Sequence, residues 1–300
     1  MAAQPSSGPG PGLSQVSPQR PVRDDRRIGA ILLATNKLTP QQVEEILGVQ
    51  KMRGARFGET AVRLGFIGVD DLRRALAEQY DAPHLRPDNR RANDELVVAS
   101  MPFHPCAEQI RAVRTRLLVR WAKGAIRGRM LAVVSPGPGE GRSYFAANLA
   151  VAFAQLGEQT LLIDAALRRP RQQRIFQVDD SVGLAALLAG RAKGSAIVPV
   201  PEFGPLSVLP AGASPPNPLE LLSRDSFAIL LHELQREYQV ILLDTPAAEL
   251  CSDAYTIAFR AGSALMLARK NVTSVTAMNR VIAELGETGA GIAGTVFNAF

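Results

Sequence analysis

The sequence has little cysteine, few aromatic residues and no long apolar run. Its two cysteines, Cys106 and Cys251, lack the paired spacing of a disulfide framework or a zinc site. No apolar stretch reaches the roughly 18 residues that a membrane-spanning helix needs, so we expect no such helix. The N-terminus also lacks the apolar core of a signal peptide, and we therefore expect a cytoplasmic protein.

Aromatic residues make up only 5% of the chain, and none is interleaved with the arginine clusters. The formal net charge of +6 comes largely from arginine, which is concentrated in residues 20–27 and 168–174. Grooves that bind single-stranded nucleic acids usually combine basic residues with stacking aromatic rings. We therefore interpret both clusters as solvated basic faces and expect no DNA ligand.

The composition changes along the chain and indicates four segments. Residues 1–27 are rich in proline, glycine, serine and glutamine, which is typical of a disordered arm. Residues 28–85 contain an internal repeat, and residues 86–105, with several prolines and a polar tract, are typical of a linker. In residues 106–300, apolar runs alternate with amphipathic segments.

The repeat aligns residues 27–50 with residues 56–79, an offset of 29 residues. Each half predicts a short helix, a turn and a second helix, which is typical of a small helical module. Thr39 and Pro40 are expected at the N-cap and the first position of the second helix. Three residues are expected to form the apolar stripe of that helix: Val43, Ile46 and Leu47.

The alternation beyond the linker predicts the fold class. Six apolar runs are expected to be strands: 130–135, 160–164, 206–211, 239–244, 263–269 and 292–298. Three amphipathic segments between them are expected to be helical: 143–156, 217–237 and 273–287. Such strands, separated by helices, indicate an α/β fold with a doubly wound, mostly parallel sheet.

The segment SPGPGEGRS, residues 135–143, predicts a phosphate-binding loop (P-loop). Its three glycines let the backbone turn tightly, so that successive N–H groups can point at a phosphate. Ser143 then begins a helix, whose N-terminal dipole also favours an anion. The loop lies between an expected strand and an expected helix, which is the context that such a motif requires.

Two acidic residues end apolar strands downstream of this loop. Asp244 could reach a magnesium ion beside the Ser143 hydroxyl, and Asp164 closes a second strand. Open parallel sheets bind ligands beyond the carboxyl ends of their strands, so we expect both acids in one pocket. The alternative is that each carboxylate caps the N-terminus of a helix.

Residues 106–300 resemble the bacterial tyrosine kinases (BY-kinases) of exopolysaccharide chain-length control, and within them the EpsG type. The resemblance rests on five motifs: SPGPGEGRS as Walker A, LLIDAALRRP (161–170) as Walker A′, VILLDTPA (240–247) as Walker B, LPAGASPPNPLELL (209–222) and EQIRAVRTRL (108–117). It implies ATP and Mg²⁺ as cofactors, and phosphorylation of tyrosines on neighbouring subunits.

The resemblance also assigns roles to individual residues. A run of consecutive residues would cradle the phosphates: Gly139, Glu140, Gly141, Arg142, Ser143 and Tyr144. Ser143 and Asp244 would hold magnesium. Asp164 would orient or deprotonate the tyrosine hydroxyl, with Arg142 and Arg168 as basic members of the catalytic set.

The fifth motif implies assembly. In the family, a helix of this pattern packs against a neighbouring subunit in a ring, which assigns Glu108, Arg111 and Arg114 to an oligomer interface. Without the family, the same residues form one polar face of a helix. The resemblance further implies a membrane chain-length determinant (Wzz-like) partner, which would hold the protein at the inner membrane.

Three features depart from the family pattern. Arg142 replaces the Walker lysine, and arginine is bulkier and planar. Ala166 replaces the second acid of the A′ motif. The last residues of the chain carry no tyrosine cluster, so we expect no autophosphorylation on such a cluster. These departures favour nucleotide binding over catalytic turnover.

Three functions stay open. An active kinase would phosphorylate another protein, whereas a catalytically silent scaffold would bind ATP and assemble the polysaccharide machinery. A positioning ATPase of the MinD/ParA kind has the same fold. Those ATPases carry a second lysine early in the loop, where this chain has Gly137, and this difference disfavours them.

The helical repeat resembles the MshEN-like N-terminal module of type II secretion ATPases, whose members bind cyclic di-GMP. The resemblance implies a ligand set shared by the two halves of the repeat: Arg27, Gly29, Arg56, Gly58 and Gly65. Arginine can stack on guanine and pair with phosphate. In the first half Asn36 replaces a motif glycine, and this degeneracy favours the alternative, a docking domain without a nucleotide.

Overall fold

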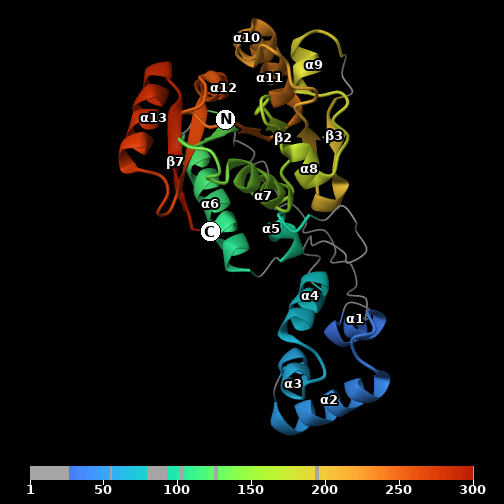
Figure 1. Ribbon diagram of the computed structural model, residues 1–300. Helices are drawn as coiled ribbons and strands as arrows, with labels where there is room; N and C mark the ends of the chain where they lie inside the picture. The colour runs from blue at the N-terminus through green and yellow to red at the C-terminus, as the bar shows by residue number, and fades with distance from the viewer. Residues whose placement is uncertain are drawn as a thin grey trace, which may run out of the picture. The chain divides into compact units, whose positions relative to one another are not determined.

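The chain folds into two compact units, residues 1–80 and residues 81–300 (Figure 1). The structure is a computed structural model that describes residues 27–54, 56–79, 93–101, 104–124, 128–192 and 196–299. Nearly all of the expected arm and the first part of the expected linker lie outside the described residues. Among the helices that the structure describes, none is long and apolar enough to cross a membrane.

The first unit consists of two helical pairs that repeat the same geometry. Its helices are α1 (Ile28–Ala34), α2 (Pro40–Arg53), α3 (Phe57–Arg63) and α4 (Val69–Gln79). The backbone N–H of Lys37 donates to the carbonyl of Leu32, and the N–H of Phe66, 29 residues on, donates to that of Ala61. The two turns are therefore equivalent in hydrogen bonding as well as in sequence.

The residue at the centre of each turn explains how Asn36 can replace a glycine. Asn36 has φ of 53°, and its counterpart Gly65 has φ of 74°. This left-handed region suits glycine, and asparagine is among the few other residues that enter it at low cost. The first half of the repeat is degenerate in sequence, but its turn keeps the backbone conformation of the second.

The buried side of α2 differs in one residue from the expected stripe. Ile46 is fully buried and Val43 half-buried, whereas Leu47 is 44% exposed. Thr39 caps α2 as expected, since its hydroxyl accepts the N–H of Gln42 while the Gln42 side chain accepts that of Thr39. The core of this short unit needs one narrow face of α2, which leaves Leu47 on the edge.

The second unit is built on a sheet of seven strands in the order β3-β4-β2-β5-β1-β6-β7. The strands are β1 (Met130–Val134), β2 (Thr160–Asp164), β3 (Val198–Pro199), β4 (Leu206–Leu209), β5 (Val240–Asp244), β6 (Ser263–Arg269) and β7 (Gly291–Asn298). All neighbouring strands are parallel except β3 and β4. The α/β fold with a mostly parallel sheet is confirmed.

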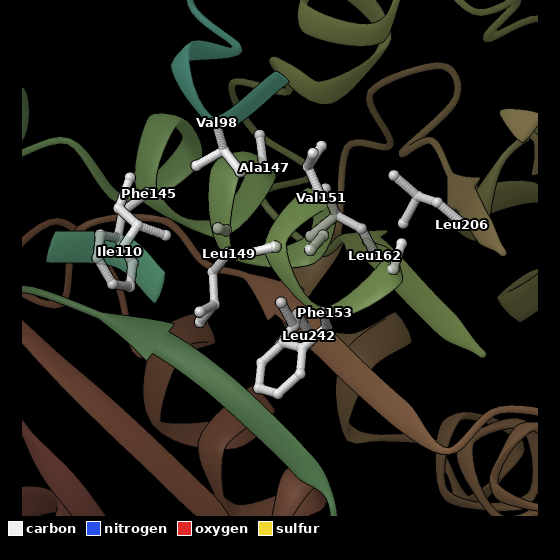
Figure 2. Close-up of a cluster of buried hydrophobic side chains, with 14 of the residues drawn as sticks. Val98, Ile110, Phe145, Ala147, Leu149, Val151, Phe153, Leu162, Leu206 and Leu242 are labelled. Atoms are coloured by element: carbon white, nitrogen blue, oxygen red, sulfur yellow. The ribbon is translucent and has the colours of Figure 1, made fainter. Parts of the chain in front are cut away.

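Helices cover both faces of this sheet. They are α5 (Val97–Ser100), α6 (Pro105–Ala122), α7 (Arg142–Ala154), α8 (Gln172–Phe176), α9 (Leu184–Leu188), α10 (Pro218–Ser223), α11 (Asp225–Glu237), α12 (Asp253–Ala261) and α13 (Val275–Thr288), with a 3-10 turn at Pro201–Phe203. Leu162 and Leu242 pack with α6 and α7 on one face, as Figure 2 shows. Ile163 and Leu243 pack on the other face with residues of α9 to α13.

Part of the expected linker belongs to the core of the second unit. Leu96, Val97 and Val98 are buried there, and Val98 donates its backbone N–H to the Asn148 side chain on α7. The expectation of a linker through residue 105 was therefore wrong for residues 96–99. The apolar run 96–99 is long enough for only one helical turn, and it lies among prolines and polar residues that are typical of a linker.

The first residues of the LPAGASPPNPLELL motif, in the loop after β4, lie close to the backbone of the loop that precedes α9. A Cβ on Gly183 would lie only 2.3 Å from the backbone nitrogen of Gly212. The backbone N–H of Leu184, at the start of α9, donates to the carbonyl of Pro210. Glycine is therefore required at position 183, and this contact fixes the loop after β4.

Candidate nucleotide-binding site

The loop between β1 and α7 has the backbone of a phosphate-binding loop. Gly139 has φ of 72° and Gly141 has φ of 94°, and both values favour glycine strongly over residues with a side chain. Gly141 is the N-cap of α7, so the free N–H groups of the first helical turn lie at the end of the loop. The SPGPGEGRS segment therefore forms the strand–loop–helix unit expected from its sequence.

Glu140 ties this loop to the neighbouring edge of the sheet. Its side chain is 2% exposed and accepts hydrogen bonds from the backbone N–H of Gly137, at 2.9 Å, and from the Thr273 hydroxyl. Asn298 donates to the Glu140 carbonyl at 3.3 Å, and Arg269 donates to the Gly139 carbonyl at 3.2 Å. These contacts hold the loop in one conformation through groups from the ends of β6 and β7.

Arg142 lies against the inside of the loop. Its Nε donates to the Thr245 carbonyl at 2.9 Å, and its Nη1 donates to the Gly137 carbonyl at 2.7 Å and to the Ser135 hydroxyl. Burial lowers the pKa of the guanidinium, partly offset by the charges of Asp244 and Glu140. Three acceptors arranged around a planar guanidinium explain how arginine fits a position that usually holds lysine.

Asp244, at the end of β5, is a fully buried carboxylate beside the start of α7. The Gln172 side chain donates to its Oδ2 at 2.8 Å, while its Oδ1 has no hydrogen-bond partner among the described residues. Burial raises the pKa of Asp244, against the hydrogen bonds from Ser143 and Gln172, which lower it. A buried carboxylate oxygen without a partner is a group that a bound cation would satisfy.

Asp164 lies opposite Asp244 in the register of β2 and β5 and is also fully buried. It accepts the backbone N–H groups of Arg171 and Gln172, each at 2.9 Å, and that of Ala166 at 3.2 Å. Burial, followed by the charge of Asp244, raises the pKa of Asp164 to about 7. Asp164 thus caps the turn that begins α8, which is the alternative role considered for it, and it lies beside Asp244 as well.

The remaining members of the expected catalytic set are held by other partners. Arg168 forms a two-point ion pair with Asp253 at the start of α12, at 2.9 and 3.2 Å. Ala166, in the position of the missing acid, is buried and donates its N–H to Asp164. We call the buried pair Asp164 and Asp244 the acidic centre. Arg168 is 44% exposed, so its paired guanidinium lies at the rim of this centre.

The donor set fits magnesium only together with a bound phosphate. Ser143 and Asp244 would supply oxygen ligands, and the buried Asp244 Oδ1 has no hydrogen-bond partner among the described residues. The described residues contain no group of three or more His, Cys, Asp or Glu side chains that could hold a metal. Magnesium commonly uses one or two protein carboxylates and completes its coordination with phosphates and water.

A cavity of about 920 Å³ opens beside the loop, between α6, the start of α7 and the end of β7. Gly139, Gly141 and Asn298 line it on one side, and Glu95 and Arg171 on another. The latter two form an ion pair at 2.9 Å. Tyr144 lines the same cavity with its hydroxyl 3.6 Å from the Cys106 sulfur. The volume is in the range of nucleotide-sized ligand sites.

The residues expected at an oligomer interface lie on α6. Arg111 pairs with Glu108 within the chain, and Arg114 donates to the Ala152 carbonyl of α7 at 2.8 Å. Glu108 is exposed, whereas both arginines are half-buried. Arg114 therefore already attaches α6 to α7, whereas the pair of Arg111 with Glu108 lies within α6.

The expected cyclic di-GMP residues lie at equivalent places in the first unit. Arg27 and Arg56 are the N-caps of α1 and α3, and both are exposed. A Cβ on Gly58 would meet Cδ1 of Leu72 at 2.3 Å, and one on Gly29 would lie 3.3 Å from the Phe57 ring. Both glycines thus have a packing role in addition to any role toward a ligand.

Three groups of the site were not identified from the sequence. One is Gln172, which donates to Asp244. The others are the Thr245 carbonyl, which accepts from Arg142, and Asp253, which pairs with Arg168. Gln172 lies in the 168–174 segment, which we interpreted as a solvated basic face, although its side chain is fully buried. A backbone carbonyl leaves no sequence signal, and only the fold brings Asp253 to Arg168.

Comparisons with known proteins place the second unit in a family. CapB of Staphylococcus aureus, a protein named as a tyrosine-protein kinase, is 30% identical over 203 residues, which cover 68% of this chain and 88% of CapB. The chain belongs to the bacterial tyrosine-protein kinase family. Several curated members, among them etk of Escherichia coli and ptk of Acinetobacter johnsonii, are much longer, and the chain spans only 26% to 29% of their length. No family model matches it.

Solved structures agree with this family. The chimerical protein CapA2B2 superposes with a TM-score of 0.64 at 29% identity, covering 75% of this chain and 97% of that chain. The septum site-determining protein MinD of Pyrococcus horikoshii, solved with Mg-ADP, has a TM-score of 0.51 at 27% identity over 57% of this chain and 70% of that one. The P-loop fold of this chain is therefore shared with MinD, which was solved with Mg-ADP.

Proposed function

We propose that this BY-kinase binds ATP with Mg²⁺ at the loop between β1 and α7. The observation that carries the proposal is the fully buried Asp244, whose Oδ1 is unpaired within the described chain and which lies beside Ser143. Gly139, Glu140, Gly141 and Ser143 would contact the phosphates, and Tyr144 would line the nucleoside side of the cavity. The magnesium would neutralise phosphate charge when bound.

The arrangement supports binding more strongly than turnover. Arg142, which the resemblance assigns to catalysis, uses its Nη1 on the loop itself and its Nε on the Thr245 carbonyl beyond β5. Asp164 already accepts three backbone N–H groups, so its oxygens are engaged before any tyrosine approaches. A general base must lie within hydrogen-bond reach of the proton that it removes, and these three contacts leave Asp164 about one acceptor position, on Oδ1, for that role.

A catalytically silent, ATP-binding scaffold is therefore the second candidate. Ala166 favours it, because the buried acidic centre has one carboxylate fewer than the family motif provides. The MinD/ParA-like ATPase is the third candidate, supported by the shared fold and disfavoured by Gly137.

Incubation with labelled ATP distinguishes an active kinase from a catalytically silent scaffold. The full chain is incubated with labelled ATP and Mg²⁺, with and without the cytoplasmic part of a membrane chain-length determinant protein. Label on tyrosines of either protein supports the kinase. ATP that binds and is recovered intact supports the scaffold, and ATP that does not bind at millimolar concentration contradicts both.

We further propose that the protein, whether kinase or scaffold, acts in exopolysaccharide assembly. The motif LPAGASPPNPLELL supports the assignment to the EpsG type, and Gly183 and Gly212 show why its first residues form a defined loop. The partner would be a Wzz-like protein that holds the chain at the inner membrane, and the α6 residues Glu108, Arg111 and Arg114 would face a second subunit. Co-purification of the two proteins and light scattering of the complex would test both statements.

For the first unit we propose a sensor or docking role. Equivalent N-cap positions of Arg27 and Arg56 support cyclic di-GMP binding across the two halves, whereas the packing of Gly29 and Gly58 supports a plain docking domain. Calorimetry with cyclic di-GMP should show saturable heat that disappears in Arg56→Ala if the module is a sensor. A flat trace with the unmodified chain leaves the docking domain.

A further inference from the structure

Gln172 places a neutral side chain against the buried pair Asp164 and Asp244. It is the first residue of α8 and is fully buried. Its Nε2 donates to Asp244 Oδ2 at 2.8 Å and to the backbone carbonyl of Ser143 at 3.2 Å. A single amide thus joins the end of β5 to the first turn of α7, the two elements that carry the expected magnesium ligands.

Chemistry determines the orientation of this amide. A backbone carbonyl only accepts hydrogen bonds, so the group that faces the Ser143 carbonyl must be the NH₂ of Gln172. The same NH₂ then holds one oxygen of Asp244. The other oxygen, Oδ1, and the Gln172 Oε1 are both buried and have no partner within the described residues. Two orphaned acceptors on adjacent side chains are costly unless a donor or cation enters.

The backbone of Gln172 is fixed as well. Its N–H donates to Asp164 Oδ2 at 2.9 Å, so the residue contacts both acids of the centre. Ala166 adds no polar side chain there. Gln172 therefore supplies hydrogen bonds to both acids, and it adds no negative charge to the buried pair.

We propose that Gln172 is a positioning residue of the magnesium site, which holds the Asp244 carboxylate so that its free oxygen faces the cation. The inference rests on the proposed binding of Mg·ATP. Residues that orient a metal ligand typically contribute a factor of about 10 to 100 in metal affinity. The affinity for nucleotide without metal should depend on the loop and on Arg142, and not on Gln172.

Gln172→Met tests this role, because methionine keeps the length of the side chain and removes both of its donors. Gln173→Met is the matched control, since it makes the same change one position along α8. Calorimetry measures ATP affinity for each full-length protein with Mg²⁺ and with EDTA. We expect Gln172→Met to lower the affinity for ATP with Mg²⁺ by about 10- to 100-fold and to change the affinity in EDTA by less than about twofold.

A merely structural role would give a different result. It would lower the melting temperature and weaken ATP binding equally with and without Mg²⁺, and this outcome would overturn the inference. Equal Mg²⁺ dependence in Gln172→Met and the unmodified chain would overturn it as well.

Titration with Mn²⁺ in the presence of inorganic phosphate, followed by electron paramagnetic resonance, separates the inference from the proposed function. If the unmodified chain binds no ATP, the proposed function fails. Mn²⁺ binding that is weaker in Gln172→Met than in Gln173→Met would then still support the positioning role. Equal Mn²⁺ binding by the two variants, or none by the unmodified chain, would overturn it.

Discussion

At the scale of single residues, Arg142 holds the loop together from within. Its guanidinium joins Ser135 and Gly137 in the loop to the carbonyl of Thr245 beyond β5. A lysine ammonium cannot contact such widely spread acceptors in one plane. Arginine in place of the Walker lysine therefore adds three hydrogen bonds that stabilise the loop, which we call the Arg142 brace. Their contribution to the free energy of unfolding can be measured.

Removing that brace should destabilise the second unit. Arg142→Ala leaves buried acceptors without donors, and we expect the free energy of unfolding to fall by about 1–3 kcal/mol. Arg142→Lys should recover part of the loss. Urea unfolding followed by circular dichroism measures both variants, and an unfolding free energy of Arg142→Ala equal to that of the unmodified chain would contradict the brace.

The pair Asp164 and Asp244 should make stability depend on pH. Because the pKa of Asp164 is raised from 3.8 to about 7, its carboxyl holds a proton more tightly in the folded chain than in the unfolded chain. The resulting stabilisation is fully present below about pH 4 and is lost as the pH rises to about 7. In Mg²⁺-free buffer the free energy of unfolding should therefore fall across this range.

Asp164→Asn provides the comparison for this pH dependence. The asparagine cannot ionise, so the fall in unfolding free energy between about pH 4 and pH 7 should become shallower, whatever the variant loses in overall stability. Urea titrations at several pH values measure the slope. Identical slopes for the two proteins would show that Asp164 does not titrate in this range.

At the scale of elements, Gly183 and Gly286 differ in the space that a side chain would find around them. In Gly183→Ala the new methyl group would meet the backbone of Gly212 and Pro210 at 2.3 and 2.4 Å, so the loops must move apart. We expect a loss of at least about 1–3 kcal/mol in unfolding free energy.

Gly286→Ala is the matched control for this contact. Gly286 lies inside α13, where a Cβ would have no neighbour within 4 Å among the described atoms. Alanine should stabilise the helix there by about 0.5–1 kcal/mol. Thermal unfolding of the two variants should therefore shift in opposite directions, and a destabilised Gly286→Ala would contradict the open space.

Regular elements could be predicted because their apolar patterns are local. The runs 160–164 and 263–269 match the observed bounds of β2 and β6. The antiparallel β3 has only two residues, and α5 has four, so neither is long enough to show a period. Asp164 and Asp244 could be placed together because parallel strands end at one edge of a sheet. Gln172 could not be placed there, because its position depends on how α8 packs.

At the scale of the whole molecule, the chain contains separate cores in its two units. The first unit packs around Leu32, Ile46 and Ala61, and the second packs on both faces of the sheet. A unit with its own core can fold without the other. The proposed sensor or docking role and the proposed ATP site are therefore physically separable.

Deletion of residues 1–80 tests this separation. The shortened chain should bind ATP with an affinity within about twofold of that of the full chain, because the loop, Asp244 and Gln172 all lie in the second unit. Calorimetric melting of the full chain should show a second transition that the shortened chain lacks. A shortened chain that folds and no longer binds ATP would contradict the separation.

The most direct test of the account is a calorimetric titration of the full chain with ATP in the presence of Mg²⁺. The buried, unpaired Asp244 beside Ser143 predicts saturable binding to one site per chain. The affinity should fall at least about 10-fold in Ser143→Ala and in Asp244→Asn when Mg²⁺ is present. Absence of binding at millimolar ATP, or equal affinities in all three proteins, would contradict a magnesium–nucleotide site at this loop.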